Sequence, residues 1–176
     1  MRELKIGFAG GGIMSDLGTD SDMQLFFECI SYYVPSKYPD QNWSIITDRL
    51  YRRYLKLEEL DDAESLMKIV EKEFKQLDRE AVDWSNVESG EVQSDLDRSK
   101  PTLFEIFSRY FRSFYRCIEF ALFEYNDLKF YRPIMVSITT IPDYYNYEKI
   151  SLSVFDNLKS DDKPIWWTRK IPKTTA

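Results

Sequence analysis

A run of aromatic residues at helical spacing is the feature that most constrains what this chain can fold into. After Pro101-Thr102, apolar side chains recur every three or four residues for about six turns, at Phe104, Phe107, Phe111, Phe114, Ile118, Ala121 or Leu122, and Tyr125. Such a face is stable only when the rest of the chain covers it. We therefore expect this helix to fill the centre of the core.

Shorter apolar patterns predict the elements around that helix. Steps of three and four predict helices over 20–34 and 60–77, and Thr19 with the acidic residues after it is typical of a helix N-terminus. Ser44 is expected to cap a further short helix. Alternation with period two predicts strands over 4–9, 13–18, 81–84, 130–141 and 148–155, the last two forming an antiparallel hairpin around 142–146. We predict one α+β domain over residues 1–176, with several helices around the long Phe-rich helix and a small, mostly antiparallel sheet.

The absence of histidine among 176 residues excludes several chemistries. It removes the Ser-His-Asp and Cys-His arrangements and the Glu-x-x-His metal motifs. Cys29 and Cys117 lie in apolar helical patterns, which predicts two buried, unreactive thiols. No spacing of carboxylates matches a metal-binding loop. We therefore predict no catalytic, cofactor-binding or metal-binding residues, and no enzymatic activity.

The run Gly10-Gly11-Gly12 after the first predicted strand invites comparison with phosphate-binding loops. A Walker loop would end in Gly-Lys-Ser/Thr, and a dinucleotide loop would pass directly into a helix. Met14-Ser15-Asp16 follows here instead, and nearby carboxylates would repel phosphate. The pattern favours a turn or bulge in a strand.

The N-terminal residues alternate charged and apolar side chains, unlike the apolar core of a signal peptide. No apolar run approaches the roughly 18 residues that a membrane span requires. We expect a cytoplasmic protein that makes no membrane contact.

Acidic residues are unevenly distributed in this chain of net charge −6. The stretches 78–99 and 56–64 together carry more negative charge than the whole chain has in net, which leaves the remainder slightly basic. Such runs are either solvated faces or surfaces whose potential steers a basic protein partner. The sequence is compatible with both interpretations.

Two arginine groups interrupt this acidic background. Arg109, Arg112 and Arg116 lie three and four residues apart on the long helix, and Arg49, Arg52 and Arg53 lie close together earlier in the chain. Arginines among aromatics are compatible with an alternative function, that of a nucleic-acid-binding module. The competing interpretation is an outer helix face on which the arginines pair with nearby carboxylates.

One family resemblance is carried by Lys5-Ile6-Gly7, by the turn over 17–21 and by the Phe26–Tyr33 segment, and it continues more weakly through Trp43, Leu50-Tyr51 and the segments 60–77, 81–84 and 103–106. Over about two-thirds of its length, the chain resembles the immunity protein 70 family. The glycine run, the longer helix after 103, the predicted hairpin and Trp166-Trp167 depart from the family pattern.

That resemblance implies a non-enzymatic, cytoplasmic immunity protein. Such a protein binds and neutralises the C-terminal toxin domain of a bacterial contact-dependent growth inhibition or related polymorphic toxin. The toxin is expected to be basic and a nuclease, and the immunity protein requires neither a cofactor nor direct contact with nucleic acid. Combined with the acidic stretch, the resemblance predicts that the toxin-binding residues are Asp83, Glu88, Glu91, Asp95 and Asp97.

Overall fold

The computed structural model describes residues 5–139 and 152–168. Its sheet is antiparallel with the strand order β2-β1-β3, where β1 is Lys5–Gly10, β2 is Ile13–Met14 and β3 is Met135–Thr139. Phe8 of β1 lies opposite Val136 of β3. The first predicted strand is confirmed, and within the described part of 130–141 the expected strand forms over Met135–Thr139 and not over residues 130–134.

Four helices provide most of the remaining framework: α1 over Asp20–Tyr33, α2 over Leu60–Phe74, α4 over Leu103–Ile106 and α5 over Ser108–Phe123. Thr19 caps α1 as predicted, because its hydroxyl oxygen accepts a hydrogen bond of 3.1 Å from the Asp22 N–H. The predicted long helix is interrupted at Phe107, whose φ of −100° and ψ of 15° separate α4 from α5. Beyond α5, the π-helical turn η5 spans Glu124–Leu128 and ends at Lys129 with φ of 60°.

The glycine run is the turn between β1 and β2, as the sequence predicts. Gly11 and Gly12 have φ values of 56° and 74°, a region that glycine adopts at little cost. A Cβ atom on Gly11 would lie 2.4 Å from the backbone nitrogen of Ala121 in α5. The turn therefore rests directly on the helix backbone and fixes the separation between the sheet and α5.

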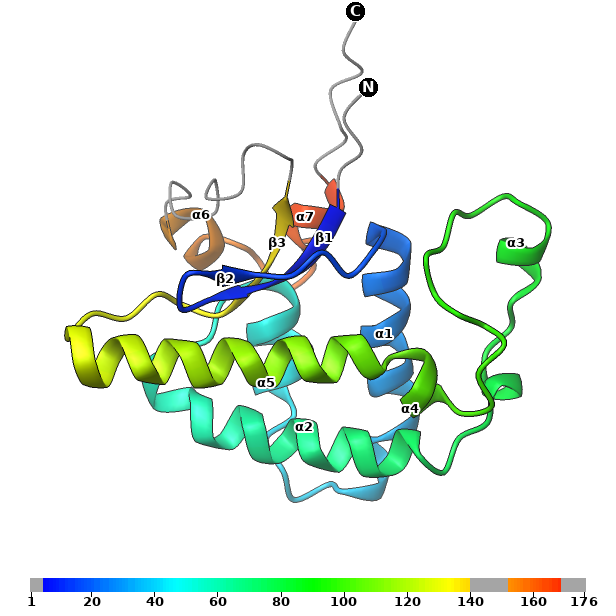
Figure 1. Cartoon of the computed structure of the whole chain (residues 1–176), viewed down its shortest axis with the longest axis horizontal. Coiled ribbons are helices and arrows are strands. Elements are labelled where there is room, and N and C mark those ends of the chain that lie inside the picture. The colour runs from blue at the N-terminus through cyan, green and yellow to red at the C-terminus, as the bar shows by residue number, and fades with distance from the viewer. Residues whose placement is uncertain (1–4, 140–151, 169–176) are drawn as a thin grey trace, which may run out of the picture.

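The core lies where α1, α2 and α5 meet beneath the sheet, and Figure 1 shows α5 running between the sheet and α2. Phe26 of α1 is fully buried at its centre. Six other rings lie with their centroids between 5.1 and 6.4 Å from that of Phe26: Phe8, Phe27, Phe74, Phe107, Tyr110 and Phe111. Their edge-to-face and tilted contacts add to the free energy that burial of the rings supplies. These observations confirm the α+β fold and its Phe-rich centre.

Short helical segments connect these elements. They are η1 over Pro35–Lys37, η2 over Ile45–Leu50, η3 over Leu57–Glu59, η4 over Arg79–Ala81, α3 over Ser85–Glu88, α6 over Leu152–Asp156 and α7 over Ile165–Thr168. The strand predicted over 81–84 is wrong, because the chain turns through η4 and thereby buries Trp84. Ser44 does not cap the next helix; its hydroxyl donates to the side chain of Asn42.

The second strand of the predicted hairpin is also wrong over 152–155, which is helical in α6. Helical spacing puts Leu152 and Phe155 on one side, against the cluster that contains Tyr54 and Met135, and leaves Val154 half exposed. The turn predicted over 142–146, and residues 148–151, lie outside the described residues.

Candidate functional site

The acidic stretch predicted from the sequence folds into a long loop with a closed neck. We call residues 78–102 the acidic loop. Asp78 and Thr102 form an antiparallel bridge at its base, and the Arg79 N–H donates to the Pro101 carbonyl at 3.0 Å. The Leu103 N–H donates to the Leu77 carbonyl at 2.9 Å. The chain therefore leaves and re-enters the body at one point, and Figure 1 shows the loop with α3 projecting beyond α1 and α4.

Trp84 anchors the outgoing limb of the acidic loop. Its side chain is 4% exposed within the main core, and its indole N–H donates to the Arg79 carbonyl at 2.8 Å. Tyr33 of α1 donates its hydroxyl proton to the Ala81 carbonyl. These contacts hold the limb between the neck and α3 in one position.

Asp22 anchors the returning limb. It is 2% exposed, and its carboxylate accepts hydrogen bonds from the Ser94 hydroxyl and from the Asp95 N–H, the latter at 2.8 Å. Thr19 also donates its hydroxyl proton to the Gln93 carbonyl at 3.1 Å. Burial raises the pKa of Asp22, although the surrounding donors oppose the shift. In the sequence, Asp22 is recognisable only as an acidic residue near a helix N-terminus, and nothing local signals this second role.

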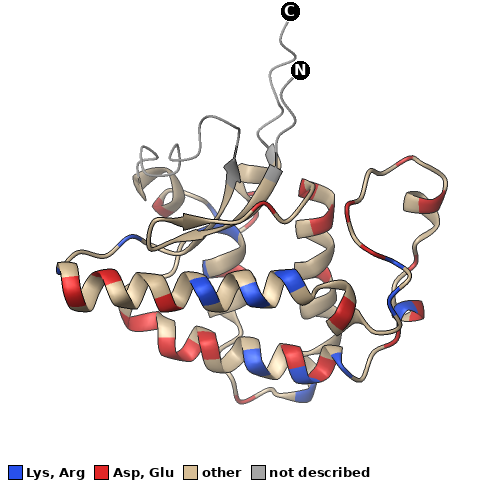
Figure 2. Ribbon diagram, in the orientation of Figure 1, with Lys and Arg blue, Asp and Glu red and all other residues tan. Residues whose placement is uncertain are grey.

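All five predicted partner-binding carboxylates lie exposed on the acidic loop: Asp83, Glu88, Glu91, Asp95 and Asp97. Figure 2 shows acidic residues, in red, at several places along the ribbon of this loop. Hydrogen bonds from Ser85 and Ser99, respectively, lower the pKa values of Asp83 and Asp97, so both carboxylates also stabilise local turns.

Among the described residues, the carboxylates of Glu88 and Glu91 do not accept hydrogen bonds that hold a turn, unlike those of Asp83 and Asp97. Glu88 lies near the tip, 3.7 Å from the Arg79 guanidinium, and exposed charge pairs of this kind contribute little to stability. At the tip itself, Gly90 turns the chain with φ of 82° and has open space around it. The tip therefore presents negative charges to solvent on a loop whose two limbs are anchored, and other parts of the protein do not crowd it at Gly90.

The second acidic stretch has a structural role. Glu59 forms an ion pair of 3.2 Å with Arg49 and accepts a hydrogen bond of 2.9 Å from the Lys56 N–H. Asp61 and Asp62 occupy the first turn of α2, where negative charge interacts favourably with the helix dipole. This stretch therefore stabilises the start of α2.

The first arginine group holds the C-terminal segment in place. Arg52 donates to the Lys159, Ser160 and Asp162 carbonyls and also bonds Asp48. Arg53 donates to the carbonyls of Phe155 and Leu158. Together with the Arg49–Glu59 pair, these bonds leave this group little capacity to bind nucleic acid.

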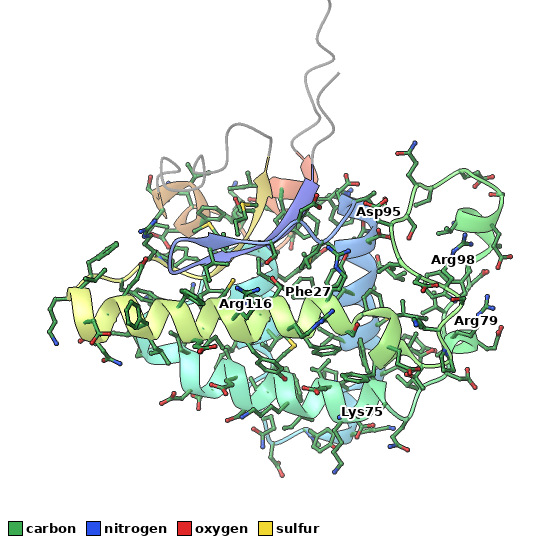
Figure 3. All side chains as sticks on the ribbon, viewed as in Figure 1. Phe27, Lys75, Arg79, Asp95, Arg98 and Arg116 are labelled. Atoms are coloured by element: carbon green, nitrogen blue, oxygen red, sulfur yellow. The ribbon has the colours of Figure 1, made fainter. Side chains whose placement is uncertain are left out.

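The second arginine group is different. Arg109, Arg112 and Arg116 are exposed on α5, and Figure 3 shows Arg116 on the side of α5 nearest the β1–β2 hairpin. Arg109 donates to the Asp16 carbonyl at 2.6 Å. In the described part of the chain, neither Arg112 nor Arg116 forms an ion pair, so the pairing with carboxylates expected for this face is wrong for these two residues.

The remaining candidate chemistries find no site in residues 5–139 and 152–168. Cys29 and Cys117 are free and buried as predicted, and burial raises both pKa values to about 12. No group of three or more His, Cys, Asp or Glu side chains could hold a metal ion among those residues. Within the same ranges, no helix combines the length and apolarity needed to cross a membrane.

Comparisons with protein-family models, with curated proteins and with solved structures find no match to this chain. The resemblance to the immunity protein 70 family therefore stays a prediction from the sequence.

Proposed function

We propose that this chain is a binding protein that captures a basic protein partner through its acidic loop, and that the partner is a toxin domain which it neutralises. The observation that carries the proposal is the loop itself. It has a net charge of −5 over 78–99, it is fixed at its neck and on both limbs, and it presents its carboxylates to solvent.

The physical support is preorganisation. A flexible acidic segment would lose conformational entropy when it bound, whereas this loop is already ordered by Trp84 and Asp22. Exposed charges contribute little to folding, but a concentrated negative potential accelerates encounter with a basic surface. The immunity-protein interpretation adds the biological class of the partner and rests on the sequence resemblance.

The nucleic-acid alternative has weaker support. Arg49, Arg52 and Arg53 are bonded within the fold, and the acidic loop would repel a polyanion from one side of the molecule. The arginines of α5 form only a short stripe, which suits a small anion better than a strand.

The decisive experiment uses the double variant Glu88→Lys/Glu91→Lys. Both side chains lie near the tip and hold no turn through their carboxylates, so the variant should fold normally. We expect association with the toxin domain encoded beside this chain to slow by roughly tenfold or more at low salt, with a much smaller difference at high salt. Stopped-flow or surface-plasmon kinetics measure the association rate constants at low and at high salt.

A matched control is Glu58→Lys/Asp62→Lys, which changes the net charge equally but in the stretch that opens α2. We expect it to retain most of the association rate. Co-expression of the natural chain with that toxin domain should restore growth. Absence of rescue would refute toxin neutralisation, and equal slowing by the two double variants would refute the acidic loop as the binding surface.

A further inference from the structure

A small pocket lies between α5 and the segment that follows β2. Its volume is about 200 Å³, and it is lined by Ser15, Leu17, Arg109, Arg112, Ser113 and Arg116. All of its polar lining side chains are hydroxyls or guanidiniums. No residue of the acidic loop lines the pocket, and its proposed ligand does not depend on the function proposed for that loop.

Two of the three arginines in this pocket, Arg112 and Arg116, form no ion pair with a carboxylate among the described residues. On α5, the arginines follow one another with axial rises of about 4.5 and 6 Å, so their side chains are neighbours. Like charges at these spacings destabilise a helix unless an anion lies between them. Across the described chain, Arg49, Arg52 and Arg132 bond to carboxylates, whereas Arg112 and Arg116 have no such partner.

Ser113 gives the pocket a second feature that points to a ligand. The residue is 4% exposed, and its hydroxyl makes no hydrogen bond in the described part of the chain beyond a weak interaction with the Cys117 thiol one turn later. A thiol is a weak partner, and a buried hydroxyl without a good partner is costly. A ligand oxygen that reached the base of the pocket would satisfy it.

We propose that this pocket binds the phosphate group of a phosphomonoester. A phosphomonoester carries a charge of about −1.5 to −2 at neutral pH, which balances the two unpaired guanidiniums. Its three terminal oxygens can accept from several arginines at once, whereas a single bidentate arginine already satisfies a planar carboxylate. Arg109, held by the Asp16 carbonyl, supplies an oriented third cation at one end of the pocket.

The surroundings favour a single phosphate over a nucleic-acid strand. The stripe is only three residues long, and Glu119 on the same helix and Asp16 beside Ser15 are exposed at its two ends. A strand laid along α5 would bring its further phosphates over these carboxylates. Selectivity for an isolated phosphate group follows from that charge pattern.

The test is calorimetric titration of the whole chain in phosphate-free buffer. The probes are inorganic phosphate, adenosine 5′-monophosphate, and a short single-stranded oligonucleotide with or without a 5′-phosphate. We expect both small probes to bind, and the oligonucleotide to bind only when it carries the terminal phosphate. Whether inorganic phosphate or the nucleotide binds more tightly distinguishes the free ion from an ester as the natural source.

The double variant Arg112→Gln/Arg116→Gln should weaken phosphate binding by about tenfold or more for each arginine removed. Glutamine is a good helix former and both positions are exposed, so circular dichroism should show an unchanged fold. Ser113→Ala should weaken binding without changing the charge. The control Lys68→Gln/Lys72→Gln removes two positive charges from α2 and should leave binding intact.

Three results would overturn the proposal. The first is an absence of binding by either small probe, and the second is binding that survives in the arginine variant. The third is an oligonucleotide without a terminal phosphate that binds more tightly than the mononucleotide, which would indicate a strand-binding surface instead.

Discussion

Replacing Asp22 by alanine should release the returning limb of the acidic loop while the body stays folded. The Asp22 carboxylate is the acceptor that joins Ser94 and the Asp95 N–H to α1. Without it, the limb keeps the Thr19–Gln93 hydrogen bond but loses the two hydrogen bonds that Ser94 and the Asp95 N–H donate to Asp22. The structure therefore predicts local opening between the tip and the neck.

The magnitude follows from the number and type of bonds. Hydrogen bonds to a charged group contribute about 1.5–3 kcal/mol each, and two are lost. Burial raises the pKa of Asp22, so the cost of desolvating the carboxylate offsets part of this sum. We expect the free energy of local opening to fall by about 1–3 kcal/mol, equivalent to amide exchange that is roughly tenfold to a hundredfold faster.

Hydrogen–deuterium exchange at the Asp95 and Leu96 amides measures this opening directly. Asp20→Ala is the matched control, because Asp20 lies two residues away, is exposed and accepts a hydrogen bond from the adjacent Ser21 N–H. Unchanged protection in the Asp22 variant, or equal loss in both variants, would refute the anchoring role.

The pH dependence of this anchor has a defined sign. The pKa of Asp22 is raised in the folded state, so the folded protein binds this proton more tightly than the unfolded chain does. The extra stability that comes from proton binding at Asp22 is therefore fully present below the ordinary pKa of 3.8 and is lost as the pH rises through the folded pKa, which leaves the contribution of the ionised carboxylate. Denaturant unfolding at a series of pH values, compared with Asp22→Asn, should show that decline, and a difference that grows with pH would contradict it.

Three further predictions concern the part of the protein outside the acidic loop. Phe26→Ala should lower the unfolding free energy by about 3–5 kcal/mol in urea titrations, because it leaves a cavity among six rings. Phe123→Ala should cost far less, because Phe123 is half exposed. The pKa of Glu73 is lowered by its tyrosine and lysine hydrogen bonds, so natural protein should lose stability relative to Glu73→Gln as the pH falls through the folded pKa. Cys29 and Cys117 should resist iodoacetamide at pH 8 until the protein is unfolded, and rapid labelling of the native protein would contradict their burial.

Periodicity predicts the framework of this fold because the same side chains that set the pattern are the ones that are buried. The steps from Phe104 to Ile118 locate the central helix, and Thr19 locates the start of α1. The break at Phe107 escapes prediction, since an aromatic residue in an apolar run has no local signal for a change of helix axis. In the segment 152–155, the alternation of apolar and polar residues predicts a strand. The segment is helical instead, and Phe155 packs against the ring of Tyr54.

Some features of the candidate sites can also be predicted from the sequence, and others depend on contacts that form only in the fold. Charge counting locates the acidic loop, since net charge is a property of the sequence alone. The anchors Asp22 and Trp84 depend on contacts between residues distant in the chain, so no local pattern identifies them. The two arginine groups look alike in sequence, and only their partners in the fold distinguish Arg52 and Arg53, which hold the C-terminal segment, from the stripe on α5.

The closed neck has a consequence for how this protein can change over evolutionary time. A side chain at Gly90, at the tip, would meet open space, and the entropic cost of closing a loop rises by only about 0.6 kcal/mol for each doubling of its length. Insertions, deletions and charge changes at the tip therefore leave the core almost unaffected. Descendants of this chain can alter the tip residue by residue to match a changing partner, while the aromatic centre beneath it stays the same.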